Sequence, residues 1–187
     1  MLAWQWIGVA FVALSVGYTV WCYNRLVFNR LRVAEAWSGI DVQLKRRSSL
    51  VPDLVLVLRA YMAHERGALE SLTEKRSLVL RDEHAGALQR GLSEAGLSNA
   101  LTQVFVTAEA YPQLKADSNF LALQRTLTDL ENQIQMSRRY YNGAVRELNV
   151  MVQSIPSNLV ARLFQFRAAE YFALADAREG QSPKLGL

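Results

Sequence analysis

The chain has little of the chemistry that metal and redox sites need. Its 187 residues include one cysteine, Cys22, and two histidines, His64 and His84. A single thiol excludes an intramolecular disulfide, and two imidazoles leave few ligands for zinc. A di-iron bundle needs Glu-x-x-His pairs, but Tyr61 and Arg81 stand three residues before the two histidines. We therefore expect no metal site and no cofactor.

Phosphate-binding turns are also absent. The ten glycines lack the spacing of a dinucleotide-binding loop, and no Gly-Lys-Ser or Gly-Lys-Thr triplet occurs. Residues 82–84, Asp-Glu-His, could hold a cation weakly, but a polar, glycine-rich segment is more simply solvated. No alternating strand pattern or hairpin signal is present. These absences favour an all-α protein that is not an enzyme.

Charged residues are missing from the first 24 positions, where residues 6–23 are almost entirely apolar. A run of this length can span a bilayer. Trp4 and Trp6 at one end, with Trp21 and Tyr23 at the other, have the placement of interfacial aromatic belts, about 26 Å apart on a helix. A cleaved signal peptide is the alternative, but it would carry a basic residue before the apolar run. We expect a retained transmembrane anchor over residues 1–24.

Basic residues follow the apolar run at once and predict its orientation. They are Arg25, Arg30, Arg32, Lys45, Arg46 and Arg47. The positive-inside rule then places a short N-terminus outside and the body in the cytoplasm of a single-pass protein. The formal charge of +4 suits an anionic membrane surface, so these residues either only fix topology or also contact lipid. A nucleic-acid partner is not expected, because base stacking needs exposed aromatics on a broader basic face.

Apolar periodicity predicts an antiparallel bundle of about four long helices over residues 25–166, followed by a C-terminal tail at 167–187. The expected helices cover residues 24–47, 50–81, 97–111 and 117–155, with a short one at 157–166. Pro52 is expected to separate the first two helices. Three glycines make residues 82–96 a predicted loop. The tail from residue 178 is expected to be disordered.

The helix at 117–155 organises the bundle. Its apolar or small residues recur at alternating intervals of three and four from Phe120 to Ile155, which is a sustained heptad seam of the coiled-coil type. Asp117 or Ser118 can cap its start, and Pro156 stops its continuation. At about 57 Å it needs partners along most of its length. The other apolar faces favour an intramolecular bundle over a free coiled coil.

Six stretches follow one another along the chain in a distinctive order. They are YNRLV (23–27), AWSGIDVQLKRR (36–47), LVPDLV (50–55), AYPQLKAD (110–117), RRYYNGAVRELN (138–149) and IPSNLVARLFQF (155–166). Together they resemble the LemA family. The resemblance implies a bacterial inner-membrane protein with a cytoplasmic helical bundle and no established enzymatic activity. It also implies kinship with a magnetosome-associated branch that acts in building membrane compartments. Ser49, Asp53 and Gly143 depart from the residues usual in the family.

Polar residues in these stretches, together with Glu131 of the long helix, are the candidate structural or interaction residues. They are Asp41, Gln43, Arg46, Arg47, Glu131, Arg138, Arg139, Asn142 and Asn149. A ladder of Glu131, Arg138 and Asn142 is expected to pair with Asp41 or Gln43 and so to fix helix register. The alternative is an arginine patch for lipid headgroups, an acidic partner or nucleic acid.

The sequence therefore predicts a membrane-anchored scaffold or interaction protein in membrane organisation or biogenesis. Its expected partners are the lipid bilayer and either another protein or a second copy of the chain. A regulatory binding module for a membrane protease or sensor protein is the alternative. We assign no catalytic residue.

Overall fold

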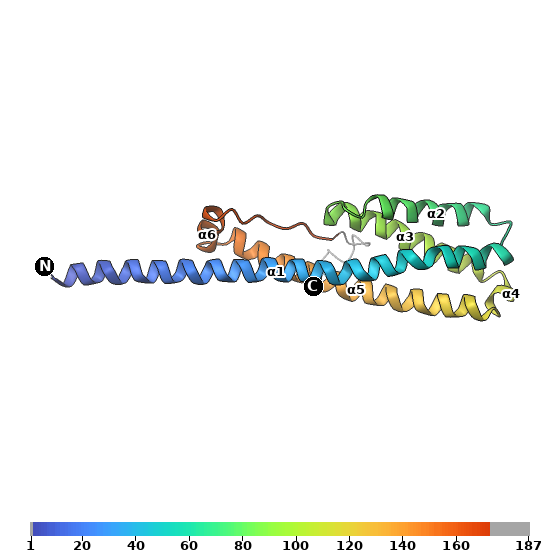
Figure 1. Cartoon of the computed structure of the whole chain (residues 1–187), viewed down its shortest axis with the longest axis horizontal. Helices are drawn as coiled ribbons and strands as arrows, with labels where there is room; N and C mark the ends of the chain where they lie inside the picture. The colour runs from blue at the N-terminus through green and yellow to red at the C-terminus, as the bar shows by residue number, and fades with distance from the viewer. Residues whose placement is uncertain (1, 173–187) are drawn as a thin grey trace, which may run out of the picture. The chain divides into compact units, whose positions relative to one another are not determined.

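The computed structural model describes residues 2–172, which are mostly helical and contain no strand within that range. The helices are α1 (Leu2–Tyr61), α2 (Arg66–Arg81), α3 (Ala87–Ala108), α4 (Pro112–Lys115), α5 (Ser118–Gln153) and α6 (Ser157–Leu163) (Figure 1). The predicted all-α class is confirmed. The tail expected to be disordered from residue 178 lies outside the described residues.

The chain forms two compact units. Among the described residues, the first unit comprises residues 2–38 and 140–169, and the second comprises residues 39–139 and 170–172. Helices α1 and α5 each contribute a segment to both units. The division into an anchor at 1–24, a bundle at 25–166 and a tail at 167–187 stays a prediction.

Helix α1 is the one described helix that is long and apolar enough to cross a membrane. Its most apolar 18-residue window has a mean hydropathy of 1.5, and 6% of that window is buried. A core helix of a soluble protein would bury most of such a window, whereas here Trp4, Phe11 and Trp21 are all exposed. The exposed apolar surface is what a lipid-facing segment requires.

The expected break at Pro52 is wrong, because α1 runs through the proline without interruption. Proline has no N–H to donate to the carbonyl four residues earlier, which belongs to Ser48. Arg76 of α2 supplies the missing donor, with its Nε 3.0 Å from the Ser48 carbonyl oxygen. The chain reverses later, at residues 62–65, so the predicted helix at 50–81 is divided between α1 and α2.

The expected loop at 82–96 is likewise shorter than predicted. Only residues 82–86 form a turn, and α3 begins at Ala87. Gly91 and Gly96 lie inside this helix, at a cost of about 1 kcal/mol each relative to alanine. Buried residues along α3, among them Leu97 and Val104, offset that cost by packing.

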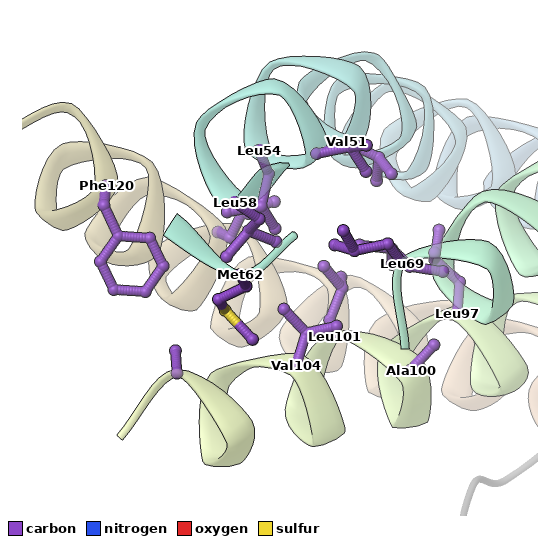
Figure 2. Close-up of a cluster of buried hydrophobic side chains, with 14 of the residues drawn as sticks. Val51, Leu54, Leu58, Met62, Leu69, Leu97, Ala100, Leu101, Val104 and Phe120 are labelled. Atoms are coloured by element: carbon purple, nitrogen blue, oxygen red, sulfur yellow. The ribbon is translucent and has the colours of Figure 1, made fainter. Parts of the chain in front are cut away.

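Four long helices, together with Leu114 of the short helix α4, form the core of the second unit. Val51, Leu54 and Leu58 of α1 meet Leu97 and Leu101 of α3, and α2 and α5 contribute further apolar residues (Figure 2). Each fully buried aliphatic side chain of this kind contributes roughly 1.5–3 kcal/mol. The predicted packing of four helical segments is confirmed for this unit.

The bounds of α5, Ser118–Gln153, lie close to those of the helix predicted at 117–155. Asp117 caps it, since its Oδ1 accepts the backbone N–H groups of Asn119 and Phe120 at 2.9 Å each. Heptad residues such as Leu130 and Ile134 are buried, which confirms the seam. Ile155, at the end of the predicted seam, is instead 84% exposed and lies beyond the helix.

The first unit joins α1, α5 and α6 around Cys22, Leu26, Leu148, Val160 and Ala161. Two contacts between α1 and α5 give their direction. The salt bridge from Arg32 to Glu147 measures 2.6 Å, and the rings of Trp37 and Tyr141 lie 5.4 Å apart. Residue numbers rise along α1 as they fall along α5, so the two segments are antiparallel.

Candidate functional site

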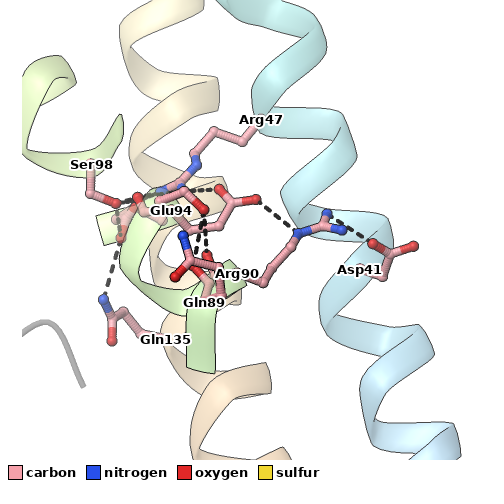
Figure 3. A network of polar contacts seen from close by, with 9 residues as sticks. Asp41, Arg47, Gln89, Arg90, Glu94, Ser98 and Gln135 are labelled. Carbon is pink, nitrogen blue, oxygen red and sulfur yellow. Dashed lines mark hydrogen bonds and ion pairs between the residues drawn. The ribbon is translucent and has the colours of Figure 1, made fainter. Parts of the chain in front are cut away.

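A network of buried charges connects α1, α3 and α5 in the second unit (Figure 3). Arg47 of α1 is 1% exposed. Its Nη2 lies 2.6 Å from Glu94 Oε2 of α3, while its Nη1 lies 2.5 Å from Glu131 Oε2 of α5. The same Nη1 donates to Ser98 Oγ at 2.5 Å. One guanidinium therefore binds two helices at once, which the planar, multi-donor geometry of arginine permits.

Arg90 of α3 forms the second centre of the network and is also buried. Its Nη2 lies 2.9 Å from Asp41 Oδ1 of α1, and its Nε lies 3.5 Å from Glu94 Oε1. Nη1 donates to the backbone carbonyl of Glu83 at 2.5 Å. Arg90 thus ties α3 to α1 and to the turn that precedes α3.

Glu94 lies between the two arginines and is the most enclosed acid of the network. Burial raises the pKa of its carboxyl, and the charges of Arg47 and Arg90 only partly offset that effect. Removing a carboxylate from water is costly, and the two guanidinium groups that face Glu94 reduce that cost. The site is a tightly coupled arrangement of charges.

Lys45 extends the network to its exposed rim. Its Nζ lies 3.0 Å from Asp41 Oδ2 and 2.9 Å from Glu83 Oε1. These hydrogen bonds, chiefly the one to Glu83, raise the pKa of the lysine amine, and Lys45 lowers the pKa of Glu83 in return. A cavity of about 130 Å³ adjoins this rim, lined by Leu44, Lys45, Ser48, Ser49, Arg76, Val79, Leu80, Glu83 and Arg90.

The geometry of the network suits structure better than chemistry. Arg47, Arg90 and Glu94 are directed at one another and are closed off from solvent. Within residues 2–172, no group of three or more His, Cys, Asp or Glu side chains could hold a metal ion. Buried charges that require mutual pairing set the register of neighbouring helices, because any other register leaves a charge unpaired.

Three of the sequence-predicted residues join this network: Asp41, Arg47 and Glu131. Elsewhere on α1, Gln43 is half-buried and Arg46 is exposed. On α5, Arg138 is 6% exposed, Arg139 is exposed and Asn142 is half-buried. Trp4, Trp6, Trp21 and Tyr23 all expose their side chains, as interfacial residues would.

Asn149 has a separate role in the first unit. Its Nδ2 donates to the Ala169 carbonyl at 2.9 Å, and the Ala169 N–H donates to its Oδ1 at 2.8 Å. The pair of bonds attaches the segment after α6 to α5. The predicted residue is thus part of the packing of the chain's own helices.

Sequence reasoning missed Arg90, Glu94 and Ser98. The glycines around Arg90 and Glu94 led to the prediction of a loop, in which charged residues do not fix the register of helices. Ser98 lay in the helix predicted at 97–111, without an assigned role. Their spacing of four residues was the available signal, because it places all three on one face of a helix. Recognising it would have required knowing that α3 begins before Gly91.

Comparison with known proteins decides the family. The model of the LemA family matches residues 36–186, which is most of the chain. The chain belongs to the LemA family. The resemblance noted from its ordered motifs is therefore confirmed, and the network residues Asp41, Arg47, Arg90, Glu94 and Glu131 all lie within the matched region.

The chain is also similar, at low sequence identity, to magnetosome proteins. The LemA-family chain is 22% identical over 190 aligned residues to magnetosome protein MamQ 2 of Paramagnetospirillum magneticum, covering 89% of this chain and 70% of that protein. Magnetosome protein MamQ 1 of the same organism matches equally well. Magnetosome protein MamQ of Magnetospirillum gryphiswaldense is 23% identical over 160 residues, covering 72% of this chain and 58% of that protein.

Proposed function

We propose that this LemA-family chain is a membrane-anchored scaffold or interaction protein of the bacterial inner membrane. The observation that carries the proposal is the composition of α1. Its first part is uncharged and exposes apolar side chains, and the same helix later supplies Asp41 and Arg47 to the buried network. A chain of this kind attaches a helical bundle to a bilayer.

The proposed orientation places the bundle in the cytoplasm. Arg25 is the first charged side chain of the sequence, and Arg30 and Arg32 follow it closely. Cytoplasmic flanks of membrane helices carry such an excess of arginine and lysine. A reporter fused after Leu187 tests this: activity of a cytoplasmic reporter is expected, with none from a reporter that requires export. The opposite pattern would overturn the orientation.

The buried charges and the exposed apolar surface favour interaction over catalysis. The buried acids of the second unit are held by arginines, and the exposed surface of α3 presents Leu88, Leu92 and Val106. The names of the MamQ relatives, as magnetosome proteins, favour a role in organising membranes. The proposed partners are the bilayer and a protein, which is either another copy of the chain or a different one.

Photocrosslinking from Arg139 distinguishes the scaffold from a regulatory module of a membrane protease or sensor. Arg139 is exposed, and Arg138 beside it is buried, so Arg138 serves as the matched control position. Crosslinks between copies, in membranes from the native host, support a self-assembling scaffold. A single stoichiometric foreign partner supports the regulatory module instead.

A further inference from the structure

Helix α6 exposes apolar side chains where a surface helix normally carries polar ones. Leu159 is 64% exposed and Leu163 is 71% exposed, and they are one helical turn apart. Ile155, which precedes α6, and Phe164, which follows it, are exposed as well. We call these four residues the α6 apolar tip. The opposite face of α6 is buried at Val160 and Ala161, so the helix cannot rotate to hide the tip.

The tip lies at the end of the candidate membrane span. Val160 and Ala161 pack on Cys22 and Leu26, which bracket the first charged residue of α1. The ring of Tyr23 lies 4.8 Å from the ring of Phe164 and 5.7 Å from that of Phe166. All these contacts lie within the first unit. Any bilayer that surrounds the span up to Trp21 and Tyr23 therefore meets α6 at its surface.

Charges around the tip have the sign that a lipid surface attracts. Outside the uncharged run, the described part of the first unit holds six arginines and two glutamates. One of the glutamates, Glu147, is paired with Arg32. Arg162 lies within α6, and the guanidinium of Arg30 lies 5.4 Å from the ring of Phe166. The arginines are Arg25, Arg30, Arg32, Arg146, Arg162 and Arg167.

We propose that the α6 apolar tip inserts into the interfacial layer of the leaflet on the Arg25 side of the membrane, with a preference for anionic phospholipid. Short amphipathic elements bind membranes by burying apolar side chains at the headgroup boundary and by attracting anionic headgroups. The tip supplies the apolar side chains, and the arginines supply the attraction. The inference rests on the membrane anchoring proposed above and adds a second, monotopic contact to the span.

Lipid is the occupant that the position favours. The tip continues the exposed apolar surface of α1 past the aromatic residues Trp21 and Tyr23, so one medium can cover both. A docked second copy or a foreign protein would have to displace the headgroups that this same level of the bilayer supplies. The experiment described next distinguishes lipid from either of these protein occupants.

The test labels the full chain at single cysteines in a Cys22→Ala background. Leu163→Cys reports on the tip, Leu92→Cys on an equally apolar exposed site of α3, and Val9→Cys on the span. Each variant is reconstituted in phosphatidylcholine vesicles with and without phosphatidylglycerol and carries an environment-sensitive fluorophore. Quenching is measured with nitroxide-bearing lipid and with aqueous iodide.

The expected result is strong lipid quenching and weak iodide quenching at residue 163, with the reverse at residue 92. Phosphatidylglycerol should increase the lipid quenching at 163 several-fold, and Arg162→Gln with Arg167→Gln should reduce that increase. Iodide quenching at 163 equal to that at 92, with Val9 still in lipid, overturns the inference and leaves the anchor intact. Protection of 163 from both quenchers also overturns it, because protein then covers the tip. Iodide quenching at Val9 would instead refute the anchor.

Discussion

Two carboxyl groups in the second unit have pKa values shifted in opposite directions by their surroundings. Asp117 accepts backbone N–H groups at the start of α5, and these bonds, with one from the hydroxyl of Tyr61, lower its pKa. Glu94 is surrounded by protein, and burial raises its pKa despite two neighbouring arginines. Both carboxyl groups are close to hydrogen-bond donors, so the opposite directions of their pKa shifts result from the difference in their solvation.

Glu94→Gln should be among the most destabilising conservative substitutions in the chain. The amide keeps the shape of the side chain but leaves Arg47 and Arg90 without the carboxylate that lies between them. We expect a loss of about 3 kcal/mol, measured by denaturant unfolding in detergent. Glu74→Gln, at an exposed position of α2, is the control and should cost less than about 0.5 kcal/mol. Equal effects at the two sites would contradict the assigned role of Glu94.

Asp117 should contribute to the acid sensitivity of the protein. Because its pKa is lowered in the folded state, the folded chain binds fewer protons there than the unfolded chain does. The resulting stability is present above the ordinary pKa of aspartate and is lost as pH falls through the lowered value. Asp117→Asn retains a capping oxygen but does not titrate. The variant's melting temperature should therefore fall less steeply than the wild type's below about pH 4, and parallel curves would contradict this.

At the scale of helices, the seam of α5 allows a direct test. Leu130 is buried in it, whereas Met136 of the same helix is exposed. Leu130→Asp places a charge in an apolar core and should cost several kcal/mol. Met136→Asp adds the same charge to the surface and should change stability by less than about 0.5 kcal/mol. Thermal unfolding followed by circular dichroism measures both, and similar melting curves would show the seam to be misassigned.

The continuity of α1 through Pro52 depends on Arg76, and a double-mutant cycle can measure that dependence. In the wild type, Arg76→Met removes the donor to the Ser48 carbonyl and should cost about 1–3 kcal/mol. In a Pro52→Ala background, the new backbone N–H can reach the same carbonyl, so Arg76→Met should cost less. The coupling energy between the two changes is the measured quantity. Strict additivity would mean that Arg76 does not compensate for the proline.

Helices differ in how far the sequence alone predicts them, and the cause is the range of the interactions that define them. The start of α5 depends on Asp117 and on N–H groups two and three residues away, so the cap can be predicted from neighbouring residues. The heptad seam can be predicted as well, because it is a periodic pattern within one helix. The course of α1 past Pro52 depends on Arg76, and the start of α3 depends on packing that outweighs its glycines. Such contacts between distant segments leave no periodic pattern in the sequence.

In the charge network, too, some features follow from the local sequence and others depend on contacts between distant segments. Asp41, Arg47 and Glu131 were identified as candidates, but the partners of Asp41 and Arg47 include Arg90 and Glu94, which lay in the expected loop. The charged residues were therefore predictable from their motifs, whereas their pairing was not, because pairing depends on which helix faces which. The same holds for the α6 apolar tip, whose exposure follows from its packing on α1.

For the whole molecule, the network raises the question of what buried charges contribute to a helical bundle. Apolar residues of the second unit can pack in several registers, because leucine contacts are not directional. A network that joins α1, α3 and α5 satisfies its charges in one arrangement. Its contribution is then to select that arrangement more than to increase stability. A scaffold that presents fixed surfaces to partners requires such uniqueness.

Replacing the three most buried members of the network together tests this role. In the variant Arg47→Met, Arg90→Met and Glu94→Leu, no charge is left without its partner at the centre, and Asp41 and Glu131 remain partly solvated. We expect stability to be retained or raised by about 1–4 kcal/mol, in contrast to the loss in Glu94→Gln. Methyl NMR spectra should show extra or broadened resonances where the wild type shows one set, because several registers become populated. A single sharp set would show that apolar packing alone selects the register, and a loss of stability as large as that of Glu94→Gln would show that the charges chiefly stabilise the fold.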